Sequence, residues 1–152
     1  PGFRWGTSVL PGQGVTMEDV LAETACTYPE TYVQSMTGGQ IKDILEDVCD
    51  NLFNPDPYYQ QGGDMVRVGG LLYACTPAES AGHRISELRL GDGRSLEAGK
   101  SYKVAGWASV NKQDGAPVWD VFAKHLRNGM TSGVRRDSVT VKGVEGNPGW
   151  AG

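Results

Sequence analysis

The chain has 152 residues, of which 39% are hydrophobic and 21% are charged, proportions typical of a globular domain with its own core. We therefore predict a single domain over residues 1–152. The formal net charge of −4 argues against nucleic acid as a partner, and because the sequence has no run of 18 apolar residues we expect no partner membrane and no membrane span.

Charge is distributed unevenly along the chain. Residues 1–64 carry two basic and ten acidic side chains, a net charge of −8, whereas residues 65–152 carry twelve basic and eight acidic ones, a net charge of +4. The first six residues have no Met, no charged segment and no apolar run, so we expect no signal peptide and a chain that begins inside a longer protein.

The three cysteines, Cys26, Cys49 and Cys75, form an odd set without CxxC spacing. This pattern predicts neither a disulfide framework nor a zinc site. The neighbours of the cysteines are largely apolar, which favours buried thiols.

The first predicted elements are a short helix and a strand. Thr16 followed three residues later by Asp19 resembles a capping box, which predicts a helix that continues to about Thr24. Tyr28 and Pro29 end it, and the β-branched and aromatic residues of 31–36 predict a strand.

An amphipathic helix is predicted after the Thr37–Gln40 cap. Its apolar residues recur at helical spacing: Ile41, Ile44, Leu45, Val48, Cys49 and Leu52. Its other face carries Lys42 and a group of carboxylates: Asp43, Glu46, Asp47 and Asp50. We interpret this face as solvated, while binding of a cation or a basic partner is the alternative.

Residues 54–64 combine two prolines, two glycines and the adjacent Tyr58 and Tyr59. Because proline is not tolerated in the interior of a helix or in a central strand, this segment is predicted to be a loop. The tyrosines either cover the core or are presented to a ligand or partner.

The second half of the chain is predicted to be mostly strands. We expect strands at 65–68, 71–75, 83–90, 101–108 and 138–142, and one helix that begins at Pro117 and ends at Asn128. Helices and strands are interspersed but do not follow a strict βαβ alternation, which indicates an α+β fold with a mixed sheet.

No complete active site is visible in the residues themselves. The two histidines, His83 and His125, are 42 residues apart, and neither a metal-ligand pair nor a nucleophile motif accompanies them. We interpret both as structural residues and predict no catalytic residue and no cofactor in this chain.

A family resemblance extends this interpretation. Residues 37–46 (TGGQIKDILE) resemble the TGxQLKxxLE helix of the 5'-nucleotidase C-terminal domain. Further similar segments lie in the family's order at 3–4, 16, 68–71, 77–85, 99–105 and 114–115, so that the resemblance covers about residues 3–122. It implies a 5'-nucleotidase C-terminal-domain-like mixed sheet flanked by a few helices.

Residues 46–70, 4–8 and 104–108 resemble more narrowly the SoxB branch of this family, the thiosulfohydrolases of periplasmic sulfur oxidation. The resemblance implies an N-terminal metallophosphoesterase domain in cis that binds two divalent metal ions, expected to be manganese. It also implies a SoxYZ carrier protein as partner, from whose cysteine S-thiosulfonate sulfate is released. This chain would then be the substrate-binding half, inactive alone.

The resemblance also implies a set of substrate-binding residues: Arg4, Asp47, Asn51, Tyr58, Tyr59, Arg67, Trp107 and Trp119. Arg4 stands where the family has an arginine beside the bound anion, and its planar fork of donors suits a tetrahedral oxyanion. The aromatic residues would line a channel for an extended, glycine-rich carrier arm. Packing on the core is the alternative for Trp119.

One departure bears on the substrate. Nucleotidases hold the base between two aromatic side chains, and here Met65 and Ala116 occupy those places, which argues against a nucleotide. A 5'-nucleotidase or related phosphoesterase stays open as an alternative. So does a non-catalytic binding module that uses the acidic helix face.

Overall fold

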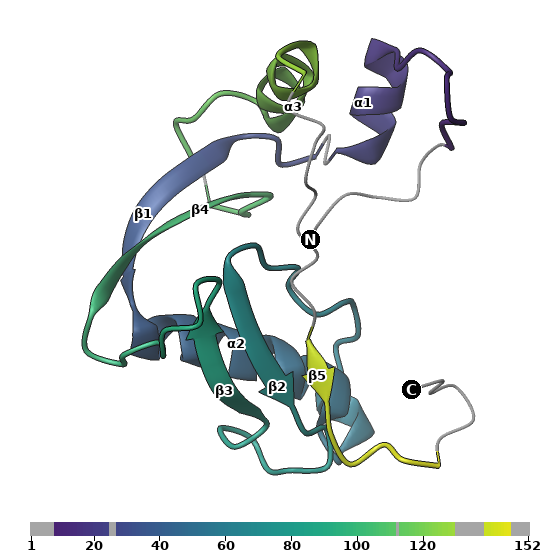
Figure 1. The fold of residues 1–152 in the computed structure, drawn as a ribbon. Helices are drawn as coiled ribbons and strands as arrows, with labels where there is room; N and C mark the ends of the chain where they lie inside the picture. Colours follow the sequence, from purple (N-terminus) through teal and green to yellow (C-terminus); the bar gives the residue numbers. More distant parts are fainter. Residues whose placement is uncertain (1–7, 25–26, 112, 130–138, 147–152) are drawn as a thin grey trace. The chain divides into compact units, whose positions relative to one another are not determined.

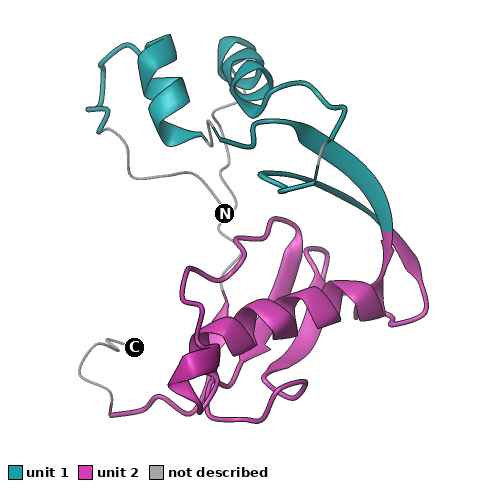
Figure 2. Cartoon of the chain, turned by 180° about the vertical axis from the view of Figure 1, so that it is seen from behind, with its two compact units in different colours: residues 1–35, 103–134 teal, residues 36–102, 135–152 magenta. Residues whose placement is uncertain are grey.

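The computed structural model describes residues 8–24, 27–111, 113–129 and 139–146. Contacts between Cα atoms divide the chain into two compact units, unit 1 with residues 1–35 and 103–134 and unit 2 with residues 36–102 and 135–152 (Figure 2). A single folding domain over residues 1–152 stays a prediction. No helix in the described ranges is long and apolar enough to cross a membrane.

Two strands carry the chain between the units. They are β1 (Thr31–Thr37) and β4 (Ser101–Trp107), which pair in a two-stranded sheet (Figure 1). Both strands lie where the sequence predicts them, since β-branched and aromatic side chains favour extended backbone.

Unit 1 is built around two packed helices, α1 (Met17–Glu23) and α3 (Val118–Arg127). The predicted capping box of α1 is confirmed, because the Thr16 hydroxyl accepts from the Asp19 N–H at 3.2 Å and the Asp19 carboxylate accepts from the Thr16 N–H at 2.8 Å. Val20 of α1 and Val118 of α3 are buried. Pro117 forms the N-cap of α3, close to its predicted place.

The start of α3 is held against the segment that enters β1. The Thr31 N–H donates to the Ala116 carbonyl at 3.1 Å, and the Val118 N–H donates to the Pro29 carbonyl at 2.8 Å. A Cβ atom on Gly115 would overlap the Thr31 carbonyl. Only glycine therefore fits at this approach.

Unit 2 contains the long helix α2 (Gly38–Phe53) and a sheet with the order β3-β2-β5. The strands are β2 (Leu71–Cys75), β3 (Ile85–Leu90) and β5 (Thr140–Val141). Strand β2 runs antiparallel to β3 and parallel to β5, so the predicted mixed sheet and α+β class are confirmed.

The core of unit 2 lies between α2 and this sheet. Figures 1 and 2 show α2 crossing one face of the sheet. Alternate residues of β2 point toward the helix and are buried with residues of α2 and β3: Leu45, Cys49, Leu71, Tyr73, Cys75 and Ile85. The apolar residues that recur at helical spacing on α2 therefore pack against the buried residues of β2 and β3 in one cluster.

The predicted cap of α2 is also confirmed. The Thr37 hydroxyl accepts from the Gln40 N–H at 3.2 Å, and the Gln40 side chain accepts from the Thr37 N–H at 2.8 Å. Gly38, the first residue of the helix, is buried, and a Cβ atom there would overlap the carbonyl of Glu97. The cap and this glycine fix where the helix begins.

Two expectations are wrong. Residues 65–68 form no strand. Met65, Val66 and Val68 instead pack on the core from irregular backbone. The segment 54–64 is not loop throughout, because the 3₁₀ turn η1 (Pro57–Tyr59) lies within it. Proline at the first position of this turn has the φ angle that a helical turn requires.

Candidate functional site

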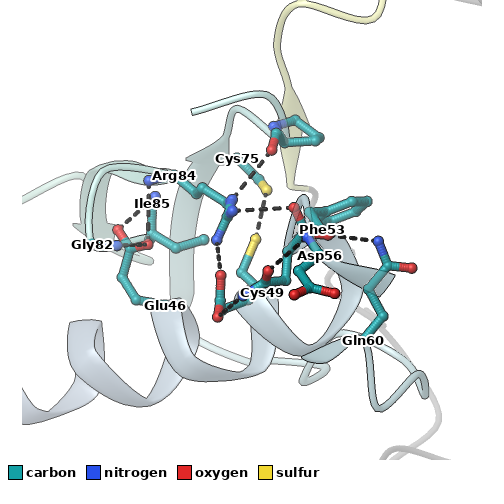
Figure 3. A network of polar contacts seen from close by, with 12 residues as sticks. Glu46, Cys49, Phe53, Asp56, Gln60, Cys75, Gly82, Arg84 and Ile85 are labelled. Atoms are coloured by element: carbon teal, nitrogen blue, oxygen red, sulfur yellow. Dashed lines mark hydrogen bonds and ion pairs between the residues drawn. The ribbon is translucent and has the colours of Figure 1, made fainter. Parts of the chain in front are cut away.

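A buried arginine organises the end of α2. Arg84 is 2% exposed, and its guanidinium donates to three oxygens (Figure 3). Nη1 lies 2.6 Å from Oδ1 of Asp50, Nη2 lies 3.1 Å from the Phe53 carbonyl, and Nε lies 3.2 Å from the Pro77 carbonyl. The positive charge therefore neutralises a carboxylate and caps the negative end of the helix.

Glu46 holds the same segment from one turn earlier on α2. Its carboxylate accepts from the backbone N–H groups of Gly82, Arg84 and Ile85 at 3.1, 3.2 and 2.8 Å. Lys42 pairs with it at 3.3 Å. Charged hydrogen bonds of this kind are stronger than neutral ones, so α2 is firmly joined to the chain just before β3.

These contacts correct the interpretation of the acidic helix face as solvated. Glu46 is 7% exposed, and the Asp50 side chain is 31% exposed. The Arg84 hydrogen bond, with one from Asn54, lowers the pKa of Asp50 below its ordinary value of 3.8. Only Asp43 and Asp47 of the predicted acidic group are exposed as expected.

Hydrogen bonds continue from this pair into the loop after α2. The second Asp50 oxygen accepts from the Asn54 side chain at 2.8 Å. Asn54 then accepts from the Asp56 N–H at 3.0 Å through its side chain and from the Gln60 side chain at 2.6 Å through its carbonyl. The loop is therefore built on the buried Arg84 rather than left independent.

This scaffold presents an aromatic turn, which we define as residues 57–59. The Asp56 carboxylate accepts from the Tyr58 N–H at 3.0 Å and caps the turn. Tyr58 is 95% exposed and Tyr59 is 65% exposed. The alternative in which these tyrosines cover the core is therefore wrong, and both rings lie open on the surface of unit 2.

An open groove of about 570 Å³ lies beside the same network. Its walls are the end of α2 and the segment before β3: Asp50, Phe53, Asn54, Pro55, Pro77, Ala78, Glu79, Ser80, Ala81 and Arg84. Asp50 and Arg84 neutralise each other, so the groove offers mixed polar and apolar contacts together with the carboxylate of Glu79.

The other predicted site residues of unit 2 lie on two segments. Asp47 is exposed, and Asn51, one turn later on α2, is half-buried. The Asn51 carbonyl accepts from the Gly62 N–H at 3.1 Å, which joins the helix to the loop carrying the aromatic turn. Arg67 is exposed and lies 3.6 Å from the Asp64 carboxylate.

The predicted aromatic residues of unit 1 are Trp107 at the end of β4 and Trp119 in the first turn of α3. Both are half-buried. Arg4 lies outside the described residues.

The described residues do not fit a metal centre. Among them no group of three or more His, Cys, Asp or Glu side chains is arranged to hold an ion. His83, in unit 2, and His125, in unit 1, are both exposed. The two ions that the resemblance implies therefore have no ligand set in the part of the chain seen here.

The model of the 5'-nucleotidase C-terminal domain matches residues 2–124. The chain thus belongs to the 5'-nucleotidase C-terminal domain family. No curated protein sequence matches the chain significantly.

Comparison with solved structures shows which members of this family the chain resembles. The chain is similar to sulfate thiohydrolase SoxB of Thermus thermophilus, solved with glycerol, with 39% identity over 92% of this chain and a TM-score of 0.79. This similarity is consistent with a SoxB C-terminal domain.

Two more distant structures share the fold at 16% identity. They are a putative 5'-nucleotidase of Staphylococcus aureus, with a TM-score of 0.63 over 85% of the chain, and a 5'-nucleotidase precursor of Thermus thermophilus, with 0.58 over 84%. The chain spans 27%, 30% and 28% of the three solved chains in turn. Each relative is therefore much longer than this chain.

Proposed function

We propose that this chain is the substrate-binding C-terminal part of a periplasmic thiosulfohydrolase that releases sulfate from cysteine S-thiosulfonate on a SoxYZ carrier. The observation that supports this most is the 39% identity to SoxB over 92% of the chain, a likeness far above the 16% shared with the two 5'-nucleotidase structures.

In this proposal the hydrolytic step belongs to an N-terminal metallophosphoesterase domain in cis, together with its two divalent ions, expected to be manganese. This chain binds and orients the substrate. The family model that matches residues 2–124 is named as a C-terminal domain, which supports a partner domain before it. The fragment alone would be inactive.

The aromatic turn is the proposed contact for the carrier arm. An extended glycine-rich segment has little side chain of its own, so flat rings such as those of Tyr58 and Tyr59 can pack along its backbone. Both rings are exposed on a turn held by Asp56 and Asn54. A rigid turn loses little conformational entropy when it binds.

The other proposed substrate-binding residues are assigned charged, polar or apolar contacts according to their side chains. Arg4 and Arg67 would supply positive charge to the thiosulfonate anion. Asp47 and Asn51 would give polar contacts from α2, and Trp107 and Trp119 would add apolar contacts from unit 1.

A nucleotide substrate is disfavoured by two residues at the places where nucleotidases stack the base. Met65 is half-buried and packs on the core of unit 2. Ala116 offers no ring, and its carbonyl already accepts from Thr31. Without aromatic side chains at these places, stacking energy for a base is lost.

The full-length protein tests this function directly. We expect sulfate release from an S-thiosulfonate-loaded carrier with a kcat/KM at least about a hundredfold above that for phosphate release from AMP, as expected when one substrate finds its polar partners and the other does not. A carrier whose cysteine has been alkylated is the control and should release no sulfate. Faster turnover of AMP than of the loaded carrier would refute the proposal.

A further inference from the structure

A pair of buried thiols lies in the core of unit 2, outside the proposed substrate contacts. The Sγ atoms of Cys49 and Cys75 are 3.3 Å apart. Cys49 is fully buried and Cys75 is 4% exposed. Both are free thiols in this structure, as the sequence predicts, but their pairing across 26 residues could not be seen in the sequence.

The backbone around each sulfur is fixed by its own contacts. Cys49 follows Glu46 on α2, and Glu46 accepts from the Ile85 N–H at 2.8 Å. Ile85 is the strand partner of Cys75 in the β2–β3 register. On the other edge of β2, the Cys75 carbonyl accepts from the Lys142 N–H at 2.9 Å.

These contacts hold the helix and the strand together on both sides of the two sulfurs. The same carboxylate that fixes α2 binds the residue opposite Cys75. A disulfide bond is about 2.05 Å long, so the sulfurs must approach by only about 1.2 Å more. Small side-chain rotations can provide a movement of this size without a change of fold.

We propose that Cys49 and Cys75 form an intramolecular disulfide when the chain folds in the presence of a disulfide-containing oxidant. One Sγ–Sγ bond forms and the two thiols lose their hydrogens. The S–S bond of the oxidant breaks, takes up the two electrons and two protons, and leaves as two thiols.

The bond should form during folding rather than afterwards. Burial is the main cause that raises the pKa of the Cys49 thiol to about 12, and exchange requires a thiolate that the oxidant can reach. In the closed core the Cys49 thiol is neither deprotonated nor accessible to the oxidant. For the same reason the finished disulfide should resist reduction until the core opens.

A Cys26→Ser variant of the chain allows a clean test, because it leaves only Cys49 and Cys75. The variant is unfolded with a reductant, refolded with reduced and oxidised glutathione, then denatured and alkylated. We expect a mass lower by two hydrogen atoms, no alkylation, and a peptide in which Cys49 and Cys75 are linked. We also expect a higher urea midpoint than for the reduced form, since the crosslink restricts the unfolded chain.

The matched control is the same variant with Cys49→Ala added, in which Cys75 stands alone. Its cysteine should be alkylated or carry glutathione, and its urea midpoint should not respond to the oxidant. If the two-cysteine variant refolds but both of its thiols are alkylated after equilibration with oxidised glutathione, the proposal is wrong. A disulfide that lowers the urea midpoint would contradict the inference that the folded core accommodates the bond without strain.

Discussion

Replacement of Arg84 by methionine should destabilise the chain by about 2–3 kcal/mol, since this side chain is 2% exposed and its loss leaves several hydrogen-bond acceptors without a donor. Asp50 would lose its counter-charge, and the Phe53 and Pro77 carbonyls would each lose a donor. The measurement is the free energy of unfolding from urea denaturation, followed by helical circular dichroism.

Arg94→Met is the matched control for this experiment. Arg94 also pairs with a carboxylate, Asp92, at 2.7 Å, but its side chain is 69% exposed. Exposed pairs contribute little to stability, so this variant should unfold close to the parent chain. Equal effects of the Arg84 and Arg94 substitutions would show that the buried network does not stabilise the fold.

Removal of both rings of the aromatic turn should weaken carrier binding strongly. In the full-length protein, Tyr58→Ala combined with Tyr59→Ala should raise KM for the loaded carrier by at least about a hundredfold, because each ring contributes about 1.5–3 kcal/mol when it is covered. The kcat should change little, since neither ring is assigned to the hydrolytic step. This prediction rests on the proposed function.

Two comparisons separate recognition of the arm from damage to the fold. Tyr28→Ala removes a ring that is 43% exposed but is not assigned to the site, and it should leave KM unchanged. A small substrate, thiosulfonate on free cysteine, should be hydrolysed equally by parent and double variant. A double variant with the parent's KM for the loaded carrier would exclude the aromatic turn from binding.

Local signals in the sequence account for the elements that were predicted well. Thr16 and Thr37 each have a capping partner three residues later, and α1 and α2 begin there. The i, i+3, i+4 pattern from Ile41 to Leu52 places α2, and the apolar run that follows two glycines places β2 at its predicted bounds. Such signals act within a few residues and need no tertiary partner.

The errors arise where a distant segment decides the outcome. Met65, Val66 and Val68 have apolar side chains suited to a strand, but they pack on the core of unit 2 from irregular backbone. Glu46 and Asp50 look solvated because nothing in the helix sequence reveals that Arg84 returns to them from more than 30 residues away. The sequence pattern of a polar helix face is the same whether its charged residues are exposed to solvent or paired with a distant residue.

The candidate site shows the same division. Prolines and adjacent tyrosines identified residues 54–64 as a segment of interest, but composition alone left two roles for Tyr58 and Tyr59. Their exposure follows from the Asp50, Asn54 and Asp56 hydrogen bonds beneath them. The sequence therefore identified the loop that carries the two tyrosines, whereas the aromatic turn and its exposure became visible only in the structure.

The most direct test of whether this chain binds the substrate is hydrogen exchange of the metal-free full-length protein. Exchange is measured with and without a glycine-rich arm peptide whose cysteine carries thiosulfonate. If the proposed function holds, the metal-free protein should bind the arm without cleaving it. We predict that amides of residues 58–62 exchange at least about tenfold more slowly with the arm than without it, as binding that covers a surface turn suppresses its local opening. Protection confined to residues outside this chain would contradict the account.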